Sequence, residues 1–249
     1  MRKYANPTIF LDLVARLLPW LAGATALLLA IGLTMSMQAP ADYQQGETVK
    51  IMYVHVPAAW LSMFIYGTMT LAALGTLVWR HPLADAAQKA AAPLGAGFTL
   101  ICLATGSLWG KPMWGTWWVW DARLTSVAVL FVIYLGLIAL WNMIEDHGTA
   151  ARAAAILTLV GAINIPIIKF SVDWWSTLHQ SASVLRLGGP KIAPSLLWPL
   201  LVMALAFTLL FLTQHLMAIR NEILRRRLRR LSILAIEDNL QQMHMEAAQ

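Results

Sequence analysis

Charge is scarce in this sequence. Only 12% of its 249 residues are Asp, Glu, Lys or Arg and 59% are hydrophobic, whereas roughly 25% of a soluble globular protein is charged. Several uncharged runs approach or exceed the about 17 to 25 residues that cross a bilayer as a helix. We therefore predict an all-α integral membrane protein, with residues 1–249 as one domain of six transmembrane helices. The approximate spans are 17–37, 58–79, 92–109, 123–143, 153–171 and 196–218. Span five is the weakest, so five spans are the alternative, although Lys169 can extend its long side chain to the interface and lengthen that span.

Cysteine is nearly absent as well, because the one thiol, Cys102, lies in the middle of predicted span three. This excludes a disulfide, a Cys-x-x-Cys redox pair and a thiolate metal cluster built from this chain alone. The sequence contains neither the phosphate-binding motif G-x-x-x-x-G-K-[ST] nor the zinc-hydrolase motif H-E-x-x-H. No group is arranged for nucleophilic or acid–base catalysis. We predict a chain that is not an enzyme, with any ATP hydrolysis located on a partner subunit.

Basic residues are unevenly divided between the two ends of the predicted helices. The N-terminal arm with Arg2 and Lys3, the loops 80–93 and 145–152, and the tail carry 12 of the 18 lysines and arginines. Because cytoplasmic loops are enriched in Lys and Arg, we predict that both termini are cytoplasmic. Residues 38–57, 110–123 and 171–196 would then face outward. The basic cytoplasmic tail, 220–249, has apolar residues at helical spacing, and we expect it to lie along the anionic inner leaflet.

Tryptophan is abundant in one connection. Five of the 12 tryptophans fall between residues 109 and 120, around the stretch W-G-T-W-W-V-W-D at 114–121. Tryptophan joins a large apolar face to one N–H donor, so it suits a membrane interface or the binding surface of a flat, mostly apolar ligand. Membrane anchoring explains tryptophans elsewhere in the chain, but five in one connection exceed what anchoring requires. If the segment is helical, one face collects Trp114, Trp117, Trp118 and Asp121.

Of the six histidines, only His55 and His179 fall on the predicted outer face. Pro57 is expected to open span two just after His55. Two imidazoles on separate outer loops could bind an iron porphyrin as axial ligands, and the alternative is that each is a solvated loop residue. Four cations on the same side are candidates to pair with the propionates of such a ligand: Lys111, Arg123, Arg186 and Lys191. Arg123 could instead pair with Asp121 at the start of span four.

The motif W-G-x-x-W-x-W-D-x-R-L-T, at residues 114–125, resembles the tryptophan-rich (WWD) signature of the haem-handling proteins of cytochrome c biogenesis. Within that group, the length, the spans and the two flanking histidines are similar to those of the haem exporter protein C family. The resemblance implies that haem, b-type and non-covalent, is held at the periplasmic face of the bacterial inner membrane with His55 and His179 as axial ligands. It also implies a haem- and chaperone-binding shelf, with Arg123 as the nearest propionate-binding or structural cation. The shelf residues are Trp114, Trp117, Trp118, Trp120 and Asp121.

The same resemblance implies partners. Haem would pass to a periplasmic membrane-anchored haem chaperone, within an ABC-type complex that has an ATP-binding subunit, a second permease-like subunit and a small single-span subunit. Because five indoles cannot all face one disc, we expect a two-sided segment, with some indoles against haem and the rest, with Asp121, presented to the chaperone. The alternatives are a b-type electron-transfer cytochrome, a permease that itself carries haem across the membrane, and a purely structural role of the tryptophans.

Overall fold

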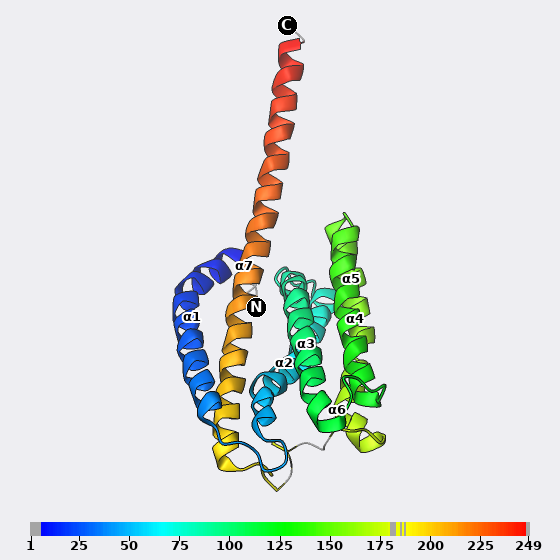
Figure 1. Ribbon diagram of the computed structural model, residues 1–249. Helices are drawn as coiled ribbons and strands as arrows, with labels where there is room; N and C mark the ends of the chain where they lie inside the picture. Colours follow the sequence, from blue (N-terminus) through cyan, green and yellow to red (C-terminus); the bar gives the residue numbers. More distant parts are fainter. Residues whose placement is uncertain (1–5, 180–182, 185, 187, 248–249) are drawn as a thin grey trace.

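The computed structural model describes residues 6–179, 183–184, 186 and 188–247. Arg2 and Lys3, two of the residues assigned above to the cytoplasmic side, lie outside this range. The regular elements of the described chain are helices (Figure 1). In chain order they are α1 (Pro7–Gln38), the 3₁₀ helix η1 (Glu47–Ile51), α2 (Met52–Val78), α3 (Ala84–Trp114), α4 (Ala122–Met143), α5 (His147–Gly161), α6 (Asn164–Trp174) and α7 (Pro194–Ala247).

Six helical units of the described chain are long and apolar enough to cross a membrane. They are Pro7–Gln38, Glu47–Val78, Ala84–Trp114, Ala122–Met143, His147–Trp174 and Pro194–Met245. The prediction of an all-α protein with six spans is therefore confirmed, and the five-span alternative is wrong. Most of these units are longer than the predicted spans, because those spans came from uncharged runs and the helices continue into residues that include charged ones. Lys89 of α3, for example, lies 3.1 Å from the carboxylate of Glu222 of α7.

The fifth span is a broken helix. Pro166 has no N–H to donate to the carbonyl of Ala162, so the α-helical pattern cannot continue across this point. Instead the N–H of Ile165 donates to the Ala162 carbonyl at 3.1 Å, in the tighter 3₁₀ pattern. Asn164 Nδ2 donates to the Ser126 carbonyl of α4 at 2.8 Å, which fixes the break against the neighbouring helix. The short helix α6 is thereby held as a separate element beside α4.

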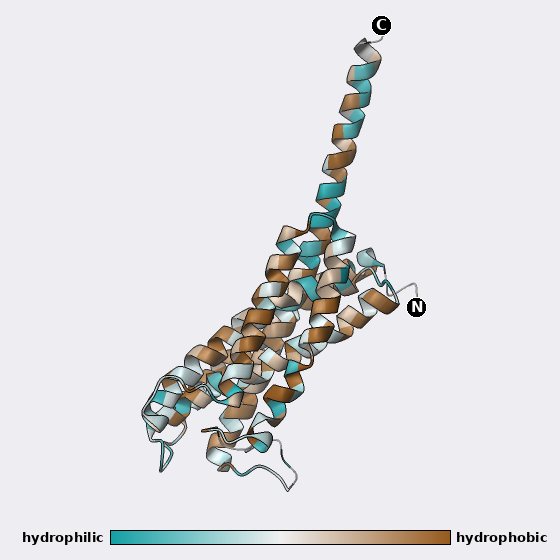
Figure 2. Ribbon diagram, turned by 90° about the vertical axis from the view of Figure 1, so that its right-hand side faces the viewer, coloured by the Kyte–Doolittle hydropathy of each residue, from teal (hydrophilic) through white to brown (hydrophobic). Residues whose placement is uncertain are grey.

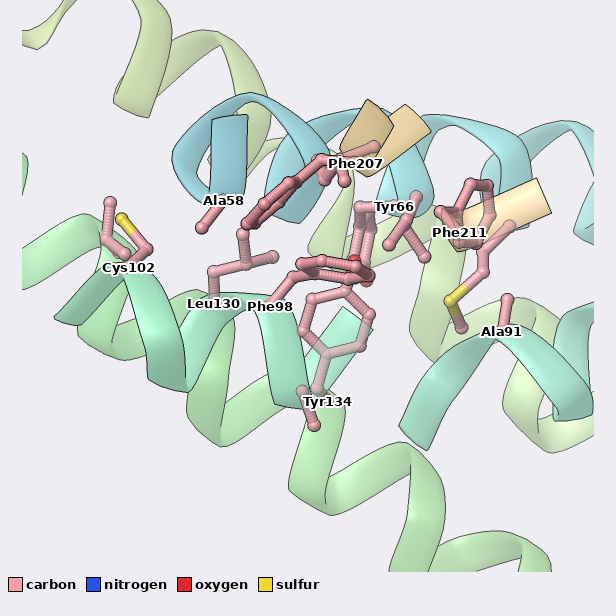
Figure 3. Close-up of a cluster of buried hydrophobic side chains, with 14 of the residues drawn as sticks. Ala58, Tyr66, Ala91, Phe98, Cys102, Leu130, Tyr134, Phe207 and Phe211 are labelled. Carbon is pink, nitrogen blue, oxygen red and sulfur yellow. The ribbon is translucent and has the colours of Figure 1, made fainter. Parts of the chain in front are cut away.

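A buried aromatic cluster lies in the centre of the bundle, where α2 packs against α3, α5 and α7. Tyr66 and Tyr134 meet edge to face, with ring centroids 5.4 Å apart (Figure 3). Each hydroxyl donates to a backbone carbonyl of another helix, Tyr134 to Ser62 at 2.8 Å and Tyr66 to Thr158 at 3.1 Å. Gly95 permits this packing, because a Cβ at that position would overlap the Tyr134 ring. The cluster thus joins four helices through both rings and hydroxyls.

The two ends of the described chain lie at the same end of the bundle, opposite the connections between α1 and α2, α3 and α4, and α6 and α7 (Figure 1). The last helix runs on without a break through the basic segment, and polar and apolar residues alternate along it beyond the bundle (Figure 2). The predicted position of the tail along the inner leaflet stays a prediction, although the helix itself shows no bend where it leaves the bundle (Figure 1). An ion pair holds α7 against α3 where it leaves the bundle, since Arg226 lies 3.0 Å from Asp85 of α3, and Arg226 also lies 2.9 Å from Glu222 of α7 itself.

Candidate functional site

Two neighbouring cavities, of about 230 and 220 Å³, lie at the end of the bundle that carries the tryptophan segment. His55, Gly106, Trp114 and His179 line both of them. The first cavity extends into the bundle between α2, α3, α4 and α6, and the second lies between the α1–α2 connection and the end of α3. Residues predicted from sequence to act together, but far apart along the chain, therefore border one common space.

His55 lies in the first turn of α2. The expectation that Pro57 opens this helix after His55 is wrong, because η1 runs directly into α2 and the helix begins at Met52. His55 is consequently held by a helix rather than by a loop. Its ring meets the Trp109 indole edge to face, with centroids 5.7 Å apart.

The orientation of the His55 ring follows from two acceptors on α3. Its Nδ1 lies 3.1 Å from the carbonyl of Cys102 and 3.1 Å from the hydroxyl of Thr105. A carbonyl only accepts, and the Thr105 hydroxyl donates its own hydrogen to Ile101 at 2.6 Å. Nδ1 therefore carries the proton, which leaves the lone pair on Nε2. This is the arrangement in which a protein orients an imidazole for metal binding.

Gly106 makes this position possible, because a Cβ there would lie 2.8 Å from Cε1 of His55. A Cβ at Gly110, one turn later, would meet the Trp114 ring at 2.9 Å. Neither glycine was among the site residues predicted from the sequence. Their spacing of four residues places both on one helix face, and this spacing is the signal from which the close approach could have been predicted.

The tryptophan segment is not helical. α3 ends at Trp114, where Gly115 takes a positive φ of 75°, a backbone conformation that favours glycine. Residues 115–121 are then held by local bonds, including one from the Ser107 hydroxyl to the Trp117 carbonyl at 2.6 Å. The predicted common helix face of Trp114, Trp117, Trp118 and Asp121 therefore does not form.

The segment is nevertheless two-sided. Trp114 and Trp118 line the first cavity, whereas Trp117 and Trp120 are 54% and 80% exposed. The indole N–H of Trp118 is buried without a hydrogen-bond acceptor among the described residues. Two indoles thus face the cavity and two face away from the bundle.

We predicted that Asp121 is presented outward to the chaperone. The structure contradicts this, since the Asp121 side chain is only 6% exposed. One carboxylate oxygen accepts from the N–H of Leu124 at 2.8 Å and caps α4. The other accepts from the N–H of Leu178 at 3.3 Å and lies 3.8 Å from Nδ1 of His179. The carboxylate therefore connects the start of α4 to the connection that carries His179.

His179 packs its ring edge to face against Trp114, with centroids 4.9 Å apart. Its Nδ1 is buried and has no hydrogen-bond partner within the described part of the chain. Burial lowers the pKa of His179, and the Asp121 carboxylate acts in the opposite direction. The ring is therefore neutral at pH 7, the form in which a histidine nitrogen can bind a metal.

Of the four cations predicted from the sequence to pair with propionates, only Arg123 lines a cavity. Arg123 lines the first cavity, but its Nε donates to the Ser171 hydroxyl at 3.1 Å and a terminal nitrogen donates to two carbonyls of α6 at 3.3 Å. Lys111 lies against the Trp117 ring and donates to Gly115, and Arg186 and Lys191 are exposed. The structure adds Lys169 to the first cavity, a residue that the sequence placed only at the end of a span.

The site is suited to a metal that is already coordinated by a planar macrocycle, rather than to a bare metal ion. Among the described residues no group of three or more His, Cys, Asp or Glu side chains could hold a bare metal ion. Two histidines, apolar indoles and a cation around a shared space instead match what a metalloporphyrin requires: two nitrogen ligands, an apolar surface and a partner for its carboxylates.

Comparison with known proteins agrees with this chemistry. The family described as "Heme exporter protein C" matches residues 1–234. The chain is 70% identical to a heme exporter protein C of Bradyrhizobium diazoefficiens, over 92% of this chain and 88% of that protein. It is 48% identical to the Escherichia coli K12 protein of that name, over 90% of this chain and 91% of that protein, and 44% identical to the Haemophilus influenzae one, over 96% and 98%. The chain therefore belongs to the heme exporter protein C family.

Proposed function

We propose that this chain binds haem at the periplasmic face of the bacterial cytoplasmic membrane and delivers it to a membrane-anchored haem chaperone during cytochrome c maturation. Membership of the family supports a haem-handling role. The observation that carries the site is that His55, His179 and Trp114 line both cavities. In this proposal the chain is a haem-binding subunit rather than an enzyme. It works in a complex with an ATP-binding subunit, a second permease-like subunit and a small single-span subunit.

Each residue of the site has a distinct part in holding haem. His55 presents Nε2 as a ligand because its Nδ1 is engaged by Cys102 and Thr105. The neutral ring of His179 supplies the second ligand. Trp114 and Trp118 supply apolar surface, and each indole stacked on the porphyrin contributes about 0.5 to 1.5 kcal/mol beyond simple burial. No covalent bond to haem is needed, which makes the binding reversible and suits a chain that passes its cargo on.

Delivery needs a surface outside the cavity. Trp117 and Trp120 are the exposed indoles of the segment, and tryptophan is enriched at the centres of protein interfaces. In this proposal they contact the chaperone while Trp114 and Trp118 contact haem. Asp121 is buried in the site, where it caps α4 and faces His179. The chaperone-binding surface in this proposal therefore consists of the two exposed indoles alone.

Two of the other histidines argue against an electron-transfer cytochrome with a second haem. His147 lies 2.6 Å from the carboxylate of Asp85, and His215 lies 2.9 Å from the Ala87 carbonyl. Neither histidine lines either of the two cavities described above, so neither borders a space there in which a second haem could bind. The haem-delivery function is therefore better supported than electron transfer.

The first prediction concerns orientation and follows from the 12-to-6 division of basic residues. Single cysteines that replace the exposed Tyr43 and Lys191 should react with an impermeant thiol reagent in intact cells, whereas Gln241→Cys should react only after lysis. Gln45 is unsuitable as a probe because its side chain accepts from Trp109 at 2.9 Å. Labelling of Gln241→Cys in intact cells, with protection of the other two, would show that the site faces the cytoplasm.

The second prediction concerns the ligands. His55→Ala and His179→Ala should each lose the six-coordinate bis-imidazole absorption spectrum of the purified chain with haem, because each removes one axial nitrogen. His147→Ala is the matched control, since that ring pairs with Asp85 far from the cavities, and its spectrum should be unchanged. A bis-imidazole spectrum in either alanine variant of the site would exclude that histidine as a ligand.

The third prediction separates holding haem from delivering it. Trp117→Ala with Trp120→Ala should leave haem affinity unchanged and reduce co-purification of the chaperone. Trp114→Ala with Trp118→Ala should weaken haem binding by about five- to 150-fold, because two stacked indoles are lost. Spectroscopic haem titration and chaperone capture are measured on both double variants. Equal losses of haem affinity in the two would contradict a two-sided segment.

A further inference from the structure

The two cavities differ in charge. Among the described residues, the lining of the first includes Arg123, Lys169 and Asp173, whereas the lining of the second includes no Asp, Glu, Lys or Arg. Haem is also asymmetric, because its two propionates lie on one edge of the macrocycle and apolar substituents lie on the opposite edge. Moving a carboxylate out of water without a partner costs several kcal/mol. The acidic edge therefore belongs in the first cavity.

Of the two cations there, Arg123 is largely committed to the fold. Three hydrogen bonds join its guanidinium to α6: one to the Ser171 hydroxyl and two to the carbonyls of Ile168 and Lys169. These bonds fix α6 against the start of α4. They also hold the backbone of Lys169 at the cavity.

Lys169 is differently placed. Lys169 lines the first cavity and is exposed, and its Nζ makes no hydrogen bond to an acceptor among the described residues. Asp173, one helical turn later, also lines the cavity, but none of the ion pairs among the described residues joins it to Lys169. A lysine on a flexible stem offers three donors to a carboxylate. Of the two cations that line the first cavity, Lys169 is therefore the one whose charged group is available to bind a carboxylate.

We propose that Lys169 binds a propionate of the haem held between His55 and His179, and that it thereby sets which edge of the macrocycle enters the bundle. The proposal rests on the proposed function and assigns a residue that positions the cargo. Arg123 holds the backbone of α6 in place and so positions Lys169. Asp173 lowers the affinity for haem, because its carboxylate repels the same propionate. The apolar edge of haem is left toward the second cavity, beside Trp109 and Met113.

The test compares two probes, ferric haem and ferric haem dimethyl ester, whose esterified propionates carry no charge. The purified full-length chain in detergent micelles is titrated with each, and coordination is followed by absorption. Lys169→Gln should weaken haem binding by about tenfold, the effect of one charge-assisted hydrogen bond at a partly solvated site. Its affinity for the ester should be unchanged, which also shows that the variant is folded and that both histidines still bind iron.

Three further variants complete the experiment. Lys169→Arg should restore the preference for haem, and Asp173→Asn should increase it. Lys191→Gln, which removes an exposed cation outside both cavities, should bind both probes as the wild type does.

Two outcomes would overturn the inference while leaving the proposed function in place. One is wild-type affinity of Lys169→Gln for haem, and the other is an equal loss of affinity for haem and its ester. If the wild-type chain binds neither probe with a bis-imidazole spectrum, the proposed function itself fails, and the role of Lys169 fails with it.

Discussion

The carboxylate of Asp121 is the constraint on which the site depends. One of its oxygens caps α4 at the N–H of Leu124, and the other accepts from Leu178 and faces His179. It thereby links the start of α4 to the connection between α6 and α7. A carboxylate that is only 6% exposed requires such partners, because a buried carboxylate without them is strongly disfavoured. The capping bond and the position of His179 are thus parts of one arrangement.

This arrangement explains how a short tryptophan-rich connection can have two faces. Gly115 turns the chain out of α3 and Asp121 begins α4, so the intervening residues are free of the helical repeat. Trp114 and Trp118 border the first cavity, while Trp117 and Trp120 are exposed. A helix would have placed Trp114, Trp117 and Trp118 on one side. The loss of helical structure between α3 and α4 is what allows one segment to serve a ligand and a partner.

The sequence predicted the elements that depend on bilayer physics and missed those that depend on long-range packing. Six spans follow from uncharged runs, because membrane thickness sets helix length. Sorting the histidines by side singled out His55 and His179, which line the same two cavities. The start of α2 before Pro57 depends on a preceding 3₁₀ turn that has no strong local signal. The burial of Asp121 depends on Leu178, and the place of Lys169 depends on the break before α6. Both require contacts between segments far apart in the chain.

The role of Asp121 is tested most directly by the absorption spectrum of haem bound to Asp121→Asn. Asparagine is as good a helix cap as aspartate, so α4 should remain intact, but the negative charge opposite His179 is lost and an amide group can replace the acceptor for Leu178. We expect a chain that stays folded and binds haem through His55 without the bis-imidazole spectrum. A bis-imidazole spectrum with wild-type haem affinity in this variant would contradict the claim that Asp121 positions the second ligand.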